Sequence, residues 1–189
     1  MKKIVSLAVA ALFFLNGFAQ KVSETTEELQ KLGKKPAFVM GYDYPQKTVE
    51  QALALRLKND KLKGKSSKGA VKYENVKYPT IANVPIDLYT KVTGSKKSAS
   101  VYVFVSKGYE NFVTSNDDAV IANNVKAFLA SVVNDVKNYE QAILAAEKEK
   151  EAKKAQKEHD KLVKKQQKLK KEQDKVAKDI KKSEKNMKK

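Results

Sequence analysis

The chain has 189 residues, no cysteine and a formal net charge of +17 at neutral pH. The absence of cysteine excludes disulfide bonds, thiolate chemistry and a lipid-modified cysteine at a signal cleavage site. Its large excess of lysine over acidic residues makes polyanions a class of partner to be weighed.

The first nineteen residues are typical of a bacterial secretory signal peptide. They hold a basic start, a short apolar stretch and small residues before the cleavage point: Lys2 and Lys3, Ile4 to Leu15, and Gly17 and Ala19. The apolar stretch is too short to span a bilayer comfortably. We therefore expect a mature chain that begins near Gln20, has no transmembrane segment after cleavage, and resides in the periplasm, on the outer surface or in the medium.

Composition divides the mature chain into a body, residues 20–146, and a tail, residues 147–189. The tail holds 18 lysines and nine acidic residues, a net charge of +9, whereas the body carries +6. Every aromatic residue of the mature chain lies between Phe38 and Tyr139. We therefore expect an α+β globular domain followed by a Lys-rich helical tail, which cannot bury a core alone.

The body begins with a polar segment, for which we expect a short helix from Glu24 to Leu32 that Gly33 ends. The mostly apolar run from Ala37 to Tyr44 then predicts a strand.

Pro45 is well placed to open a helix at Gln46, because proline is favoured at the start of helices. The helical spacing predicts one buried stripe, formed by Val49, Ala52, Leu53 and Leu57. The polar, glycine-flanked run from Lys61 to Gly69 predicts a solvated loop.

Three further strands are predicted from alternating apolar residues: Ala70 to Tyr78, Ile86 to Val92, and Ala99 to Ser106. Thr93 to Ser98 would form a hairpin loop between the last two. Short links favour antiparallel pairing, so we expect an α+β fold with a small, mostly antiparallel sheet of about four strands and helices packed on it.

A long helix follows, because neither glycine nor proline occurs from Tyr109 to Lys189. Ser115 is expected to cap its start, with Asp117 and Asp118 near the positive end of the helix dipole. One apolar stripe would pack on the sheet: Val125, Leu129, Val132, Val136, Tyr139 and Ile143.

The tail carries lysines in strict seven-residue register, at heptad positions c and f. They are Lys150, Lys154, Lys157, Lys161, Lys164, Lys168, Lys171, Lys175, Lys178 and Lys182, continued by Lys185 and Lys189. Seven of these twelve follow an acidic residue by three or four positions, which favours ion pairs worth roughly 0.2–0.5 kcal/mol each. The face is interpreted chiefly as solvated, and alternatively as a polyanion-binding surface.

An apolar helix-packing seam lies opposite these lysines, formed by Leu162, Leu169, Val176 and Ile180. Polar residues share the a positions, among them His159, Gln166 and Gln173. Apolar d positions beside partly polar a positions indicate a weak coiled coil.

No catalytic residue, metal site or cofactor site is predicted. His159 is the one histidine and lies in the tail, so the body has no base for a Ser-His-Asp triad and no metal-ligand cluster. Carboxylates suited to glycoside hydrolysis are Asp43, Glu74, Asp87 and Glu110, which we interpret as ordinary surface charges. The strand tyrosines Tyr42, Tyr44, Tyr73, Tyr78, Tyr89 and Tyr102 are interpreted as half-buried sheet residues rather than a ligand groove.

Three hypotheses follow for an exported, non-enzymatic envelope protein. The tail helix self-associates or packs on a partner helix through the seam. Alternatively, its lysines tether the chain to an anionic envelope polymer or membrane surface, or the body binds a small ligand or peptide and the tail is a spacer. Nucleic acid is disfavoured as a partner, because Arg56 is the sole arginine and the tail has no aromatic residue for base stacking.

Overall fold

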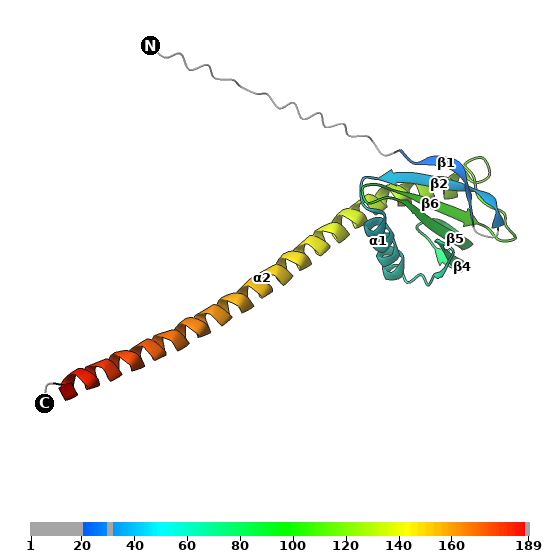
Figure 1. The fold of residues 1–189 in the computed structure, drawn as a ribbon. Helices are drawn as coiled ribbons and strands as arrows, with labels where there is room; N and C mark the ends of the chain where they lie inside the picture. The colour runs from blue at the N-terminus through cyan, green and yellow to red at the C-terminus, as the bar shows by residue number, and fades with distance from the viewer. Residues whose placement is uncertain (1–20, 30–31, 188–189) are drawn as a thin grey trace, which may run out of the picture. The chain divides into compact units, whose positions relative to one another are not determined.

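The computed structural model describes residues 21–29 and 32–187, with side chains described as far as Ile180. The predicted signal peptide, residues 1–19, lies outside the described residues, and the side chain of Lys182 lies outside the described side chains. The elements run in the order β1 (Ser23–Glu28), β2 (Lys34–Tyr42), α1 (Gln46–Asn59), β3 (Lys65–Ser67), β4 (Ala70–Tyr78), β5 (Ala82–Gly94), β6 (Ala99–Ser106) and α2 (Ala119–Met187) (Figure 1).

The six strands form one antiparallel sheet in the order β1-β2-β6-β5-β4-β3. Strands β3 to β6 follow one another as neighbours, whereas α1 joins β2 to the opposite edge of the sheet at β3. The predicted α+β class and antiparallel sheet are confirmed, and β4 and β6 have the predicted bounds. The sheet has two strands more than predicted, both short and polar and both at its edges.

Helix α1 begins directly after Pro45, whose fixed φ of −54° suits a helix start. The predicted stripe is confirmed, since Val49, Ala52, Leu53 and Leu57 are all buried. Arg56 and Lys58 lie in the last turn, where their positive charges interact favourably with the negative end of the helix dipole.

The larger core lies between one face of the sheet and the two helices. The central strands contribute every second residue to it: Phe38, Met40, Tyr42, Leu88, Val101, Val103 and Val105. The first turns of α2 contribute Val125, Phe128, Leu129, Val132 and Val136. Tyr42 fixes this packing by donating its hydroxyl to the carbonyl of Leu129 at 2.7 Å, and burial raises the pKa of Tyr42 above its usual value.

A smaller cluster covers the other face of the sheet. It is formed by Leu29, Ala37, Ala70, Tyr89, Phe104 and Phe112, with Leu32 and Tyr102 packed against it. Both faces of the central strands are therefore covered near their middle, which explains the nearly continuous burial of β6.

The prediction of a short helix between Glu24 and Leu32 is wrong. Residues Ser23–Glu28 form the edge strand β1, antiparallel to β2, with Ser23 opposite Val39. The segment is polar and shows no strand alternation, so long-range contacts decide its conformation. Glu24 pairs with Lys126 at 2.9 Å, and Glu27 pairs with Lys91 at 2.9 Å.

The loop predicted from Lys61 to Gly69 is wrong in part, because it contains β3, which pairs with the start of β4. Lys68 and Gly69 form the turn between these strands with φ angles of 45° and 81°. Three polar residues carry no periodic signal, so the pairing could not be read from the sequence.

The predicted cap of α2 at Ser115 is also wrong. Asp118 accepts the backbone N–H of Ile121 at 3.1 Å, the geometry of an N-cap, and this hydrogen bond lowers the pKa of Asp118. Ser115 instead donates its hydroxyl and its backbone N–H to Glu24.

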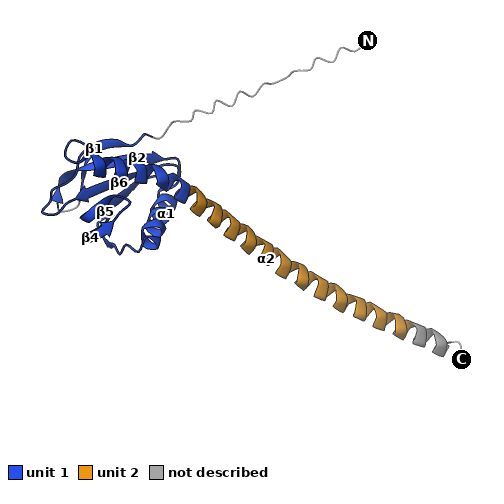
Figure 2. Cartoon of the chain, turned by 180° about the vertical axis from the view of Figure 1, so that it is seen from behind, with its two compact units in different colours: residues 1–136 blue, residues 137–189 orange. Residues whose placement is uncertain are grey.

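The chain divides into two compact units, residues 1–136 and 137–189 (Figure 2). The first part of α2 belongs to the first unit, and the buried core of that unit ends at Val136. In the predicted stripe of α2, Tyr139 and Ile143 follow this point and are only partly buried.

Candidate functional site

The four seam residues of the tail are exposed and lie along one stripe of α2. Leu162, Leu169, Val176 and Ile180 are 62%, 50%, 57% and 54% exposed. The first three are seven residues apart, so they recur on the same side of the helix every two turns. No other described tail segment exposes large apolar side chains at this spacing.

The register lysines from Lys150 to Lys178 are exposed, and the ion pairs expected for them are not formed. From Lys150 to Lys178 none has a carboxylate oxygen within 4 Å, although acidic residues precede several of them. The one lysine–carboxylate pair in the described tail joins Lys153, outside the register, to Glu149 at 2.5 Å. Holding long side chains together on a solvated surface costs conformational entropy that an exposed pair scarcely offsets.

His159 lies in the seam region with its side chain 70% exposed. Its Nδ1 is 3.8 Å from Oδ1 of Asp160, which is too far for a hydrogen bond. Over residues 21–29 and 32–187, no group of three or more potential ligands is arranged to hold a metal ion.

The body carboxylates weighed for glycoside hydrolysis are mostly engaged by lysines. Lys72 pairs with Glu74 at 3.0 Å and with Asp87 at 3.3 Å, and Glu110 pairs with Lys35 at 2.7 Å. These contacts place the three acids in ion pairs on the sheet and its loops, and Asp43 is exposed directly after β2.

Most of the strand tyrosines are buried packing residues. Tyr42, Tyr73, Tyr78 and Tyr89 are buried, and Tyr44 and Tyr102 are partly buried. Tyr78 packs edge-on against Phe128 with ring centroids 5.9 Å apart. Its hydroxyl donates to Asp60 at 2.6 Å, and burial together with this carboxylate raises the pKa of Tyr78 to about 12.

Arg56 contacts Asp60 just after α1 and links α1 to α2 through Asp135, contacts that the sequence analysis missed. Its Nε donates to Asp60 at 3.0 Å and one terminal nitrogen donates to Asp135 at 2.9 Å. The hydrogen bond with Asp60, together with Asp135, raises the pKa of Arg56. The signal available in the sequence was that Arg56 is the single arginine among 39 basic residues.

Glu24 forms a second contact missed by the sequence analysis, between β1 and the start of α2. It accepts the hydroxyl and backbone N–H of Ser115 and pairs with Lys126, which also donates to Ser115 at 2.8 Å. These contacts lower the pKa of Glu24 to about 2, and the hydrogen bonds from Ser115 have the largest effect.

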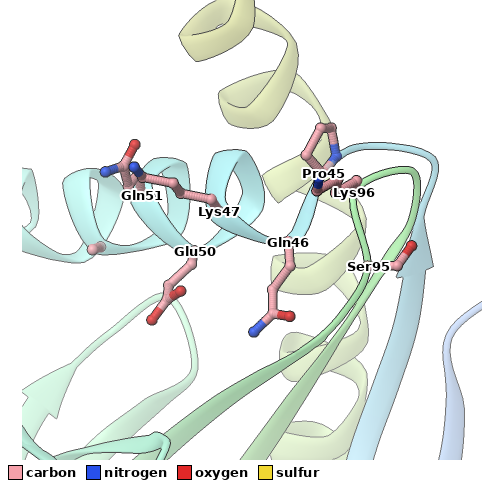
Figure 3. A pocket seen from close by; sticks show the side chains of 8 residues that line it. Pro45, Gln46, Lys47, Glu50, Gln51, Ser95 and Lys96 are labelled. Atoms are coloured by element: carbon pink, nitrogen blue, oxygen red, sulfur yellow. The ribbon is translucent and has the colours of Figure 1, made fainter.

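An open depression of about 800 Å³ lies where the first turns of α1 meet the β5–β6 hairpin. Figure 3 shows Lys47, Glu50 and Gln51 on the helix, with Ser95 and Lys96 on the hairpin. The backbone N–H of Gln46 donates to the carbonyl of Ser95 at 2.9 Å, so this helix end already has a partner. None of the lining residues is buried, so the depression does not enclose a ligand.

The segment from Lys58 to Lys68 joins the end of α1 to β3 and includes most of the run from Lys61 to Gly69 for which a solvated loop is predicted. It carries five exposed lysines, Lys58, Lys61, Lys63, Lys65 and Lys68. The density of lysine was visible in the sequence, but their lack of carboxylate partners became visible only in the structure.

No helix in the described part of the chain is both long enough and apolar enough to cross a bilayer. Comparison of the chain with protein-family models, with curated proteins and with solved structures found no match.

Proposed function

We propose that this chain is an exported, non-enzymatic module that self-associates through the tail part of α2. The observation that carries the proposal is the tail seam, in which four large apolar side chains are each at least half exposed. Single exposed apolar residues are ordinary, whereas an apolar stripe at heptad spacing is typical of a surface on which helices pair.

Burial of the seam supplies the driving force. Full burial of Leu, Val or Ile contributes about 1.5–3 kcal/mol per side chain. Because the seam residues are half exposed, about half of this free energy is still to be gained when two helices pair. Two seams together would then contribute about 8 kcal/mol, which matches micromolar association before the entropic cost of pairing is subtracted. Because the entropic cost of association is about 4 kcal/mol or more, the four side chains alone support only weak pairing.

The polar a positions favour a parallel, in-register pair. In that arrangement Gln166 and Gln173 each face their own copy, so that the amides can hydrogen-bond to one another. In an antiparallel pair each glutamine would face an apolar d residue, and a buried amide without a partner costs about 1–3 kcal/mol.

The lysines influence pairing through their summed charge. Positions c and f point away from an a/d seam, so the lysines can stay in water when two helices pair. Each tail nevertheless carries a net charge of +9, and like charge opposes association until salt screens it. Self-association should therefore strengthen as the salt concentration rises.

Sedimentation velocity of residues 20–189 tests the proposal. We expect a dimer at tens of micromolar, and a monomer for the seam variant Leu162→Gln, Leu169→Gln, Val176→Gln, which keeps good helix formers. The matched control is Lys161→Gln, Lys168→Gln, Lys175→Gln, which should associate at least as strongly because it removes repulsion. A wild-type monomer whose residues 150–189 are helical by circular dichroism would contradict the proposal.

The orientation can be tested separately because the chain has no native cysteine. Ala155→Cys and Gln173→Cys, each introduced alone, should both form disulfide-linked dimers if the pair is parallel and in register. An antiparallel pair would cross-link mainly in a mixture of the two variants.

A second candidate function is electrostatic attachment of the tail to an anionic envelope surface. The absence of carboxylates within 4 Å of the register lysines from Lys150 to Lys178 favours it, because these charges are not neutralised within the chain. Attachment of this kind weakens as salt rises, opposite to the expectation for self-association. Retention on anionic vesicles that does not change with salt would rule it out.

A further inference from the structure

We propose that the β3 lysine cluster, the five lysines from Lys58 to Lys68, binds the surface of an anionic phospholipid membrane. All five side chains are exposed and none has a carboxylate oxygen within 4 Å. The one acidic residue between them, Asp60, is already engaged by Arg56 and Tyr78. The cluster therefore keeps its full positive charge.

Several lysines on the neighbouring strands and loops differ from the cluster because they form ion pairs. Each of five others has a carboxylate partner: Lys35 with Glu110, Lys72 with Glu74 and Asp87, Lys91 with Glu27, Lys107 with Asp118, and Lys126 with Glu24. Exposed lysines without a carboxylate partner also occur elsewhere in the body, at Lys34, Lys47, Lys77, Lys96 and Lys97. At the β3 edge, however, five of them fall within eleven consecutive residues.

The backbone that carries the cluster follows a defined path. A Cβ atom on Gly64 would come within 2.4 Å of Val71 and 2.6 Å of the Tyr73 ring, so the loop runs tightly against β4. Lys61 and Lys68 have φ angles of 64° and 45°, a left-handed conformation that non-glycine residues rarely adopt.

Protection of the sheet edge is the simpler explanation, because lysines on edge strands prevent pairing with other chains. This role accounts for Lys65 in β3, but Lys58, Lys61 and Lys63 lie outside the strand. A membrane surface accounts for the whole cluster, since its diffuse negative potential attracts lysine side chains whatever their backbone setting.

The composition of the cluster favours lipid over nucleic acid. Residues 58–69 contain no aromatic side chain for stacking on bases, and Arg56 is occupied by two carboxylates. Leu55, 45% exposed, lies one turn before Lys58 on α1 and can enter the interfacial region of a bilayer.

Binding of residues 20–189 to vesicles tests the proposal. The vesicles contain equal parts of phosphatidylglycerol and phosphatidylcholine, or phosphatidylcholine alone. The cluster variant replaces Lys61, Lys63, Lys65 and Lys68 by Gln. Its control replaces four other exposed body lysines that lack a carboxylate partner, Lys34, Lys47, Lys96 and Lys97, so the change in net charge is the same.

We expect the cluster variant to bind anionic vesicles about tenfold or more weakly than the control variant, and neither to bind neutral vesicles. Equal binding by the two variants would overturn the proposal, as would preference of the wild-type chain for a duplex oligonucleotide over the vesicles.

A second test uses the wild-type chain and therefore does not depend on whether a variant folds. Lysines are acetylated in the presence or absence of vesicles, and the modified positions are mapped by mass spectrometry. Anionic vesicles should protect Lys61, Lys63, Lys65 and Lys68 more than the four control lysines. Uniform protection would contradict the proposal. The seam variant should show the same protection, so this test does not depend on self-association.

Discussion

At the scale of single residues, Arg56 makes two polar contacts, since it donates to Asp60 and to Asp135, and Asp60 also accepts the hydroxyl of Tyr78. The arginine and both carboxylates are less than a third exposed, so the pairs are partly shielded from water. This contact joins residues 79 positions apart in the sequence and fastens α1 to α2.

Arg56→Gln should therefore destabilise the body by about 1–2 kcal/mol, since it leaves two carboxylates without their charged partner. Urea unfolding followed by tyrosine fluorescence measures the change. Lys58→Gln, on the same helix but without a carboxylate within 4 Å, is the control and should shift stability by less than about 0.5 kcal/mol. Equal effects of the two substitutions would show that the Arg56 contact contributes nothing.

The contact of Glu24 with Ser115 and Lys126 should make the stability of the body depend on pH in the acid range. Its pKa is lowered from 4.5 to about 2 by the bonds from Ser115, with Lys126 adding to the effect. A carboxyl with a lowered folded-state pKa stabilises the fold fully above its unfolded value and loses this contribution as pH falls toward the folded value. The window is therefore from about pH 5 down to about pH 2.

Glu24→Gln should be less stable than wild type at about pH 6, and the difference should shrink as pH falls through that window. Unfolding free energies at several pH values measure this. Glu28→Gln, in the same strand but outside this contact, is the control for the loss of one negative charge. A constant difference between Glu24→Gln and wild type would contradict the assignment.

At the scale of elements, the sequence pattern predicted those helices and strands whose own apolar spacing determines their conformation. The buried stripe of α1 and the bounds of β4 and β6 followed from periodicity. Edge strands β1 and β3 lack any apolar alternation, and only their partners in the sheet hold them extended. The same distinction applies to the sites, since the seam is a local repeat, whereas the contacts of Arg56 and Glu24 join distant segments.

The loop between α1 and β3 contains a testable packing constraint. Gly64→Ala would place a methyl group against Val71 and the buried ring of Tyr73, so it should destabilise the body by about 1–3 kcal/mol. Gly41→Ala in β2 is the matched control, because no atom lies within 4 Å of its added Cβ. Thermal unfolding of both variants compares them, and equal midpoints would show that the loop is free to move away.

For the whole molecule, the two compact units imply separate contributions to stability and to association. The core of the first unit ends at Val136, and beyond Ile143 every described side chain except that of Val163 is exposed. Residues 147–180 therefore contribute little buried surface to the folding of the body.

A chain of residues 20–146 should accordingly unfold within about 2 °C of the chain of residues 20–189, when both are measured below the concentration at which the tails pair. The dependence of its unfolding free energy on urea should also be nearly unchanged, because that slope follows the surface exposed on unfolding. Loss of the dimer with an unchanged midpoint is the expected pair of results, since the truncation removes the seam and leaves the core. A midpoint lowered by more than about 5 °C would instead mean that the tail stabilises the body, and self-association could then no longer be tested by truncation alone.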